Sequence, residues 1–333
     1  MKKTGTLLIL FSLLLLVGCR WGKDRLNIDV SHIKIPETKI HRYDRDLFKV
    51  PVNDLQKGLG KLLPEYRYFL GDHLTDTAKL SQMMNYLQNP RNIDFYQACQ
   101  KKYTDLSSIE KGLNDAFRHY RYYFPDEKIP SVYSYVSGGD YQHPVMISDS
   151  VVILALDDYL GKTFSPYFSD GLPMYKVQRM TADNIVPDIM KALLTIKYPY
   201  DPMAVNMLES MIDAGRHLYL MDAVMPAVSA NLKIGYTPAQ YKWAEENESH
   251  IWASMIENQM LYSADARMIN IFMSDGPFTS EFARESPPRL GEWIGWNIVK
   301  AYMKHHKEVT LPELMQEKDA QKILTMSGYK PEK

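Results

Sequence analysis

The six residues from 151 to 156, "VVILAL", place the strongest limit on how this chain can fold. A continuous apolar run of this length, followed by two aspartates, predicts a β-strand that is buried on both faces. Such a strand needs partner strands at its sides and other elements packed over both of its faces. The fold must therefore enclose a small sheet.

The neighbouring sequence supplies these elements. Residues 130–157 predict a strand, a tight hairpin at Gly138–Gly139, a short strand and then the apolar strand. Residues 28–50 alternate apolar and polar and predict one or two more strands. Residues 53–124 are helical in period, with a capping box formed by Ser107 and Glu110, and nearly everything from 167 to 326 is helical as well. We expect an α+β fold, mostly helical, with a small mixed sheet in the N-terminal half. No linker interrupts residues 27–330, which predicts a single domain.

The N-terminus has the pattern of a bacterial lipoprotein signal. Lys2 and Lys3 precede an apolar stretch at 7–17, which is too short to span a bilayer, and "LVGC" closes it at Cys19. This predicts a signal peptide at 1–18, lipidation of Cys19 and a polar tether at 19–26; the alternative is a plain secretory signal with a chance cysteine. No Asp follows Cys19 and no acidic run comes after it, which favours a lipid anchor in the outer membrane, on its periplasmic face.

The composition excludes some classes of function and one kind of stabilisation. Without Lys2 and Lys3, 37 basic residues stand against 40 acidic ones, and no basic stripe indicates nucleic-acid binding. With Cys19 lipidated, Cys99 has no cysteine partner, so stability must come from the apolar core.

The best candidate for chemistry is the stretch 211–222, "MIDAGRHLYLMD". Glu209, Asp213 and His217 recur every four residues and would share one face of a helix, and Glu246 and His250 repeat this spacing. Two such helices, if they faced each other, could offer a metal set of Asp213, His217, Glu246 and His250. We favour the alternative that each pair is a helix-surface ion pair. The sequence has no His-Glu-x-x-His, Cys-x-x-Cys, Gly-x-Ser-x-Gly or P-loop motif, and we expect no catalytic residue and no cofactor.

Three other patterns have a structural and a functional interpretation. Asp157–Asp158 could be catalytic carboxylates at a strand end, but we favour caps of the next helix or turn. Gly138–Gly139 could let a ligand approach the backbone, although a hairpin explains the pair. Gly291 and Gly295 lie four apart in an apolar stretch with Trp293 and Trp296, which indicates close helix packing more than a binding groove.

Several stretches together resemble a known family. They are the "LVGC" motif, "MIDAGRHLYLMDAVMP", "KIGYTPAQYKWAEENESHIWASMIENQMLYS", "GPF", "SPPRLGEWIGWNIVKAYM" and "SGYKP". In this order and spacing they are similar to the gliding-motility lipoprotein GldB of Bacteroidetes. That family in turn resembles zincin-like metallopeptidases. On this resemblance "NIVPDIMKALL" would be the first metal helix, with Pro187 and Lys191 at the histidine positions and Asp188 at that of the catalytic glutamate, while Asp213 would stand at the third ligand.

The resemblance implies a degenerate zincin-like scaffold that has lost its zinc ligands. It implies a non-catalytic lipoprotein that supports a cell-envelope machine for gliding motility and the associated protein secretion, with protein partners in the envelope. Two alternatives stay open: a metal-dependent peptidase with non-standard ligands, and a periplasmic module that binds peptides or glycans.

Overall fold

The apolar run forms β4 (Val151–Ala155), an interior strand of a four-stranded sheet. The computed structural model describes residues 25–72 and 74–331. The strand order is β1-β2-β4-β3: β1 (Ile40–His41) and β2 (Ser131–Tyr135) run parallel to β4, and β3 (Val145–Ser148) pairs with it antiparallel. All of β4 after Val151 is buried, which confirms the prediction of a strand covered on both faces.

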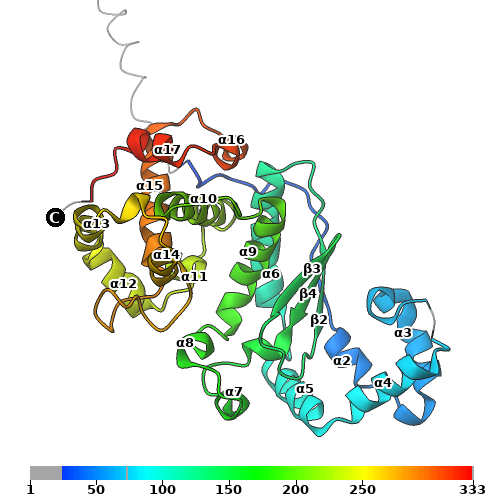
Figure 1. The fold of residues 1–333 in the computed structure, drawn as a ribbon. Helices are drawn as coiled ribbons and strands as arrows, with labels where there is room; N and C mark the ends of the chain where they lie inside the picture. Colours follow the sequence, from blue (N-terminus) through cyan, green and yellow to red (C-terminus); the bar gives the residue numbers. More distant parts are fainter. Residues whose placement is uncertain (1–24, 73, 332–333) are drawn as a thin grey trace, which may run out of the picture.

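Helices cover the sheet on both sides (Figure 1). Helix α2 (Tyr43–Leu47) packs on β2, and α9 (Ile185–Lys197) packs on β3. Beyond the end of β4, the short 3-10 helix η2 (Leu156–Tyr159) contacts α5 (Pro90–Lys102). The mostly helical α+β fold with one small mixed sheet in the N-terminal half is confirmed.

Two local predictions near the N-terminus are wrong. In 28–50, the structure forms only the two-residue strand β1 and then turns into α2. Tyr43, Asp44 and Leu47 are buried together at helical spacing, which outweighs the alternation seen in the sequence. Helix α6 (Ser107–Tyr123) has no capping box, because the carboxylate of Glu110 accepts a hydrogen bond from the Ile40 backbone amide at 2.9 Å. Glu110 thus fixes the first sheet strand to α6.

The C-terminal half is helical and is built around the crossing of α10 (Met207–Val224) and α15 (Leu290–His305). Gly215 and Gly295 meet at this crossing: a Cβ at Gly295 would overlap the carbonyl group of Met211, and one at Gly215 would overlap that of Gly295. The sequence-based prediction of close helix packing here is confirmed. The remaining helices after the sheet are α7 (Ser165–Ser169), α8 (Met174–Val177), α11 (Ala230–Ile234), α12 (Pro238–Glu246), α13 (Glu248–Glu257), α14 (Ala266–Met273), α16 (Leu311–Gln316) and α17 (Ala320–Ser327).

Helices α3 (Leu55–Leu70) and α4 (Thr77–Gln88) have a small core of their own, which includes Leu59, Tyr66 and Leu87. They lie at the far side of α2 from the large helical core (Figure 1). Phe48 packs against both cores. That residues 27–330 form one domain stays a prediction.

The described chain begins at Arg25, whose guanidinium is fixed at the C-terminal end of α15. It donates hydrogen bonds to the carbonyl oxygens of Met303, His306 and Val309 at 2.7 to 3.3 Å. The predicted signal peptide, Cys19 and most of the tether lie outside the described residues. Within 25–72 and 74–331, no helix combines the length and the apolar character that crossing a membrane requires.

Candidate functional site

The acid–histidine stripe of α10 binds a neighbouring segment of the chain, residues 198–206, which we call the strap. His217 Nε2 lies 2.6 Å from the carbonyl oxygen of Tyr198, and the ring of Tyr200 stacks on the imidazole with centroids 4.0 Å apart. Asp213 accepts a hydrogen bond from the Asp201 amide at 2.7 Å, and Glu209 accepts one from the Val205 amide at 2.7 Å. Glu209, Asp213 and His217 share one helix face, as predicted. They bind backbone groups of the strap.

Asp213 is also engaged from its other side. Its second carboxylate oxygen receives the Arg216 guanidinium at 2.6 Å, in an ion pair that is almost fully buried. Arg216 donates further to the carbonyl oxygens of Met315, in the last turn of α16, and of Glu317, which directly follows that helix. The pair therefore ties the strap, α10 and the C-terminal helices together.

Glu246 and His250 lie elsewhere. Both are exposed, on α12 and α13; Glu246 forms a surface ion pair with Lys242 at 3.5 Å, and the His250 ring has its edge contact with Phe282. The structure does not bring them to Asp213 and His217, and over residues 25–72 and 74–331 no group of three or more His, Cys, Asp or Glu side chains could hold a metal ion. The expected helix-surface ion pairs, Asp213 with His217 and Glu246 with His250, are therefore wrong: Asp213 and His217 are buried, Asp213 pairs with Arg216, and Glu246 pairs with Lys242.

A polar cleft of about 800 Å³ opens instead between η2, the loop after β2 and α8–α9. Asp140, Tyr141, Asp158 and Tyr159 line one side, and Lys176, Arg179, Asp188 and Lys191 line the other. Apolar surface comes from side chains such as Leu172, Met180 and Ala192. The cleft joins residues from Gly139 to Asp275, which are far apart in the sequence, so no local motif marks it.

The two aspartates after β4 have different surroundings. Asp157 is fully buried and accepts hydrogen bonds from the backbone and hydroxyl of Ser137 and from the Gly138 amide, at 2.7 to 3.0 Å. It holds the loop that leaves β2 and does not cap the helix or turn after the strand, so the expected capping role is wrong for Asp157. Asp158 caps nothing. It is 2% exposed, and neither of its carboxyl oxygens has a hydrogen-bond partner among the described residues.

The electrostatic surroundings of Asp158 favour its neutral form. Burial, followed by the carboxylates of Asp157 and Asp140, raises the pKa of Asp158 to about 9. At neutral pH the side chain is therefore a carboxylic acid, which offers one hydrogen-bond donor and one acceptor to whatever enters the cleft. Burial also raises the pKa of Asp157, although its three hydrogen bonds favour the charged form.

Helix α9 contributes the residues singled out by the peptidase resemblance. Pro187 is buried. Asp188 accepts a hydrogen bond from the Tyr159 hydroxyl at 2.9 Å and forms an ion pair with Arg179 at 3.5 Å. Lys191 lies one turn further along the same side of the cleft, and burial lowers its pKa while Glu292 opposes this shift. Asp188 is thus a partner of arginine and tyrosine.

The Gly138–Gly139 pair does not form the expected hairpin, because β2 pairs with β4 and not with β3. The tight turn lies between β3 and β4, where Asp149 adopts a positive φ of 51°. Gly138 and Gly139 have φ values of 71° and 97° and pass directly against Asn92 and Arg91, so a side chain would be both strained and obstructed there. Their role is a close approach of the loop to α5 at the rim of the cleft.

The same rim carries an exposed polar cluster. Arg91 and the Tyr141 hydroxyl both bind Asp170, and Arg91 also donates to the Gly138 carbonyl oxygen at 2.7 Å. These hydrogen bonds lower the pKa of Asp170. The cluster links α5, the loop after β2 and α7 across the mouth of the cleft.

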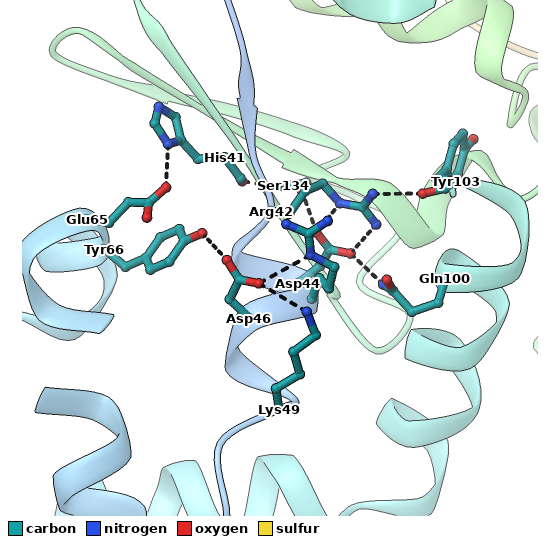
Figure 2. Close-up of polar contacts among 11 residues, drawn as sticks. His41, Arg42, Asp44, Asp46, Lys49, Glu65, Tyr66, Gln100, Tyr103 and Ser134 are labelled. Carbon is teal, nitrogen blue, oxygen red and sulfur yellow. Dashed lines mark hydrogen bonds and ion pairs between the residues drawn. The ribbon is translucent and has the colours of Figure 1, made fainter. Parts of the chain in front are cut away.

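A second buried polar group lies near α2 and has all of its partners (Figure 2). Arg42 binds Asp44 through two nitrogens at 2.8 Å and the Tyr103 carbonyl oxygen at 2.7 Å. Gln100 and Ser134 donate to the same carboxylate. Because every group in this network is satisfied, it fastens α2 to β2 and α5 and offers no free group for a ligand.

Sequence reasoning named Asp158 as a possible functional carboxylate but favoured a capping role for it, and it missed Arg179 altogether. The signal for Asp158 was available: a carboxyl directly after a fully buried strand lies at the sheet edge where ligands often bind. Nothing in the sequence indicated Arg179, because its place depends on the packing of η3 (Ala182–Asn184) and α9.

Comparison with known proteins decides the family. The family model of gliding motility protein GldB matches residues 23–331. The chain belongs to this GldB family. A search of curated proteins and a search of solved structures each found no match. For this GldB-family chain the zincin-like resemblance has no support beyond the sequence stretches themselves, and the assignment of Pro187, Asp188 and Lys191 to former peptidase positions stays a prediction.

Proposed function

We propose that this GldB-family protein is a non-catalytic lipoprotein, anchored through Cys19, that supports the gliding-motility machine of the cell envelope and the protein secretion associated with it. The family match over 23–331 carries this proposal, because it begins four residues after the lipobox cysteine and runs almost to the C-terminus. Family membership supplies the link to gliding motility, and "LVGC" supplies the anchor.

The residue types on α9 and α10 support a role in binding. On the peptidase alignment, a proline and an ammonium group stand where two imidazoles would be needed, and the Asp213 carboxylate is occupied by Arg216 and the Asp201 amide. The stripe that looks like a metal helix therefore has a structural task, which is to hold the strap.

The proposed location is the periplasmic face of the outer membrane. Arg20 follows the lipidated cysteine where an aspartate would favour retention in the inner membrane, and no acidic run follows Cys19. The partners would then be envelope proteins within reach of a membrane-anchored domain.

Replacement of the anchor cysteine tests this proposal. In a gliding bacterium that lacks its own family member, the wild-type chain should restore colony spreading, while Cys19→Ala should leave the membrane fraction and fail to restore it. Cys99→Ala is the matched control, because Cys99 is a buried free thiol inside the domain. Full complementation by a non-lipidated Cys19→Ala protein would refute the anchored role.

A binding module is the second candidate function. Its support is the cleft that contains Asp158, since a buried carboxyl without partners is rare in native proteins.

A further inference from the structure

Asp158 is the feature of this molecule that most needs an explanation. Its carboxyl group is 2% exposed, lines the cleft, and has no hydrogen-bond partner for either oxygen among the described residues. Leaving a polar group buried and unpaired has a substantial free-energy cost, so such groups are usually completed by a ligand, an ion or water. The neighbouring Asp157, by contrast, has three donors.

The charges around Asp158 favour a cationic ligand at this end of the cleft. Asp157 and Asp140 are the two charged groups whose field acts most directly on it, and both are acidic. An anionic ligand group would be repelled here. The basic side chains of the cleft come from α8, α9 and the segment between them: Arg179 is paired with Asp188, and burial disfavours the charged form of Lys191 by lowering its pKa.

The rest of the cleft suits an aliphatic stem. Leu172, Pro173 and Met180 provide apolar surface, and Tyr141 and Tyr159 line the same cleft as Asp158. A volume of about 800 Å³ is within the range of sites for small ligands or for a side chain with its backbone. Tyrosine faces also attract ammonium groups.

We propose that the cleft binds a primary ammonium group on an aliphatic stem, such as a lysine side chain, with the ammonium placed against Asp158. The bound ammonium would satisfy the two carboxyl oxygens, and the stem would lie along Leu172 and Met180. This inference does not depend on the lipid anchor or on the gliding role. Its ligand is either a lysine of a partner chain or a small free amine, which share the same chemistry.

Ligand binding should release a proton. In the empty cleft Asp158 holds its proton at neutral pH, and it must give this proton to solvent before it can pair with an ammonium ion. Asp158 also interacts electrostatically with five other ionisable side chains. They are Cys99, Tyr135, Tyr141, Tyr159 and Tyr167, and burial raises the pKa of each. The other charged groups that line the cleft are Asp170, Asp188, Asp275, Lys176, Arg179 and Lys191.

Calorimetric titration of the full-length chain in detergent micelles tests the proposal. The probes are Nα-acetyl-lysine methylamide, its Nε-acetylated form and cadaverine. We expect saturable one-to-one binding of the lysine amide, with an affinity that rises about tenfold per pH unit from pH 7 to 9. The Nε-acetylated probe should not bind. Cadaverine binding more tightly than the lysine amide would support a small amine as the ligand, and the reverse would support a lysine side chain.

Three variants make the test specific. Asp158→Asn keeps the volume of the side chain and should lower the affinity for the lysine amide at least tenfold at pH 9. Glu246→Gln, in an exposed pair on α12 away from the cleft, should leave the affinity within about twofold, and Lys191→Met should keep the pH dependence. Absence of binding at pH 9, equal binding by Asp158→Asn, or equal binding of the Nε-acetylated probe would each overturn the proposal. Circular dichroism establishes that each variant is folded.

Discussion

The crossing of α10 and α15 makes the sharpest prediction about stability. Gly295→Ala places a methyl group against the carbonyl oxygen of Met211 and 2.5 Å from its carbonyl carbon. Ordinary contact begins at 3.4 Å, so the two helices would have to separate by more than half an ångström. The obstructing atoms are backbone atoms, which cannot rotate away, and both helices are buried along this contact.

We expect Gly295→Ala to lower the free energy of unfolding by about 2 kcal/mol. Overpacking destabilises by about 1 to 3 kcal/mol, and the better helix propensity of alanine offsets about 1 kcal/mol of this. Because the methyl group meets backbone atoms, we expect the overpacking cost to lie at the upper end of its range. Gly60→Ala is the matched control: Gly60 lies in α3, is exposed, and a Cβ there meets nothing within 4 Å. It should stabilise by up to about 1 kcal/mol.

Urea denaturation followed by circular dichroism measures both variants on the same chain. The helix-packing explanation requires the two alanines to change stability in opposite directions. If Gly295→Ala were as stable as the wild type or as Gly60→Ala, the close approach of the two helices would be refuted.

Two further predictions concern aspartates. Asp158 has a pKa of about 9 in the folded protein, against an ordinary value of 3.8. Its protonated side chain therefore stabilises the folded state fully below about pH 4, and this stabilisation is lost as the pH rises toward 9. The loss is at most about 1.4 kcal/mol for each pH unit. Asp158→Asn should therefore become more stable than the wild type from pH 5 to 8 in urea melts, and parallel pH profiles would contradict the raised pKa. Asp213→Ala leaves Arg216 buried without its carboxylate and frees the strap, which should cost about 3 to 5 kcal/mol. Limited proteolysis should then cut within 198–206 before other sites, whereas Glu246→Ala, at the surface, should leave the cleavage pattern unchanged.

Periodicity was sufficient to predict the elements whose burial is continuous. The strand at Val151–Ala155, the long helices and the glycine-mediated packing near Gly295 all follow from local apolar patterns. The short helix at Tyr43–Leu47 did not, because its five residues are shorter than the pattern needed to distinguish helix from strand, and the Arg42–Asp44 network that fixes it involves residues about sixty and ninety positions away.

Partner choice was the part that sequence could not provide. Glu209, Asp213 and His217 were correctly placed on one face, yet what they bind depends on the path of the strap along α10. Likewise Asp157 and Asp158 are identical in type and adjacent in sequence, and only the loop after β2 determines that one has three donors and the other none.

The attachment of Arg25 to the end of α15 limits how far the protein could reach. If Cys19 carries the acyl chains, residues 19–24 separate it from the fixed Arg25, and a chain of that length spans about 20 Å at most. The domain would then lie close to the lipid headgroups, with the C-terminal end of α15 and helix α16 facing them. A partner that stands far out in the periplasm would have to come to the membrane to meet it.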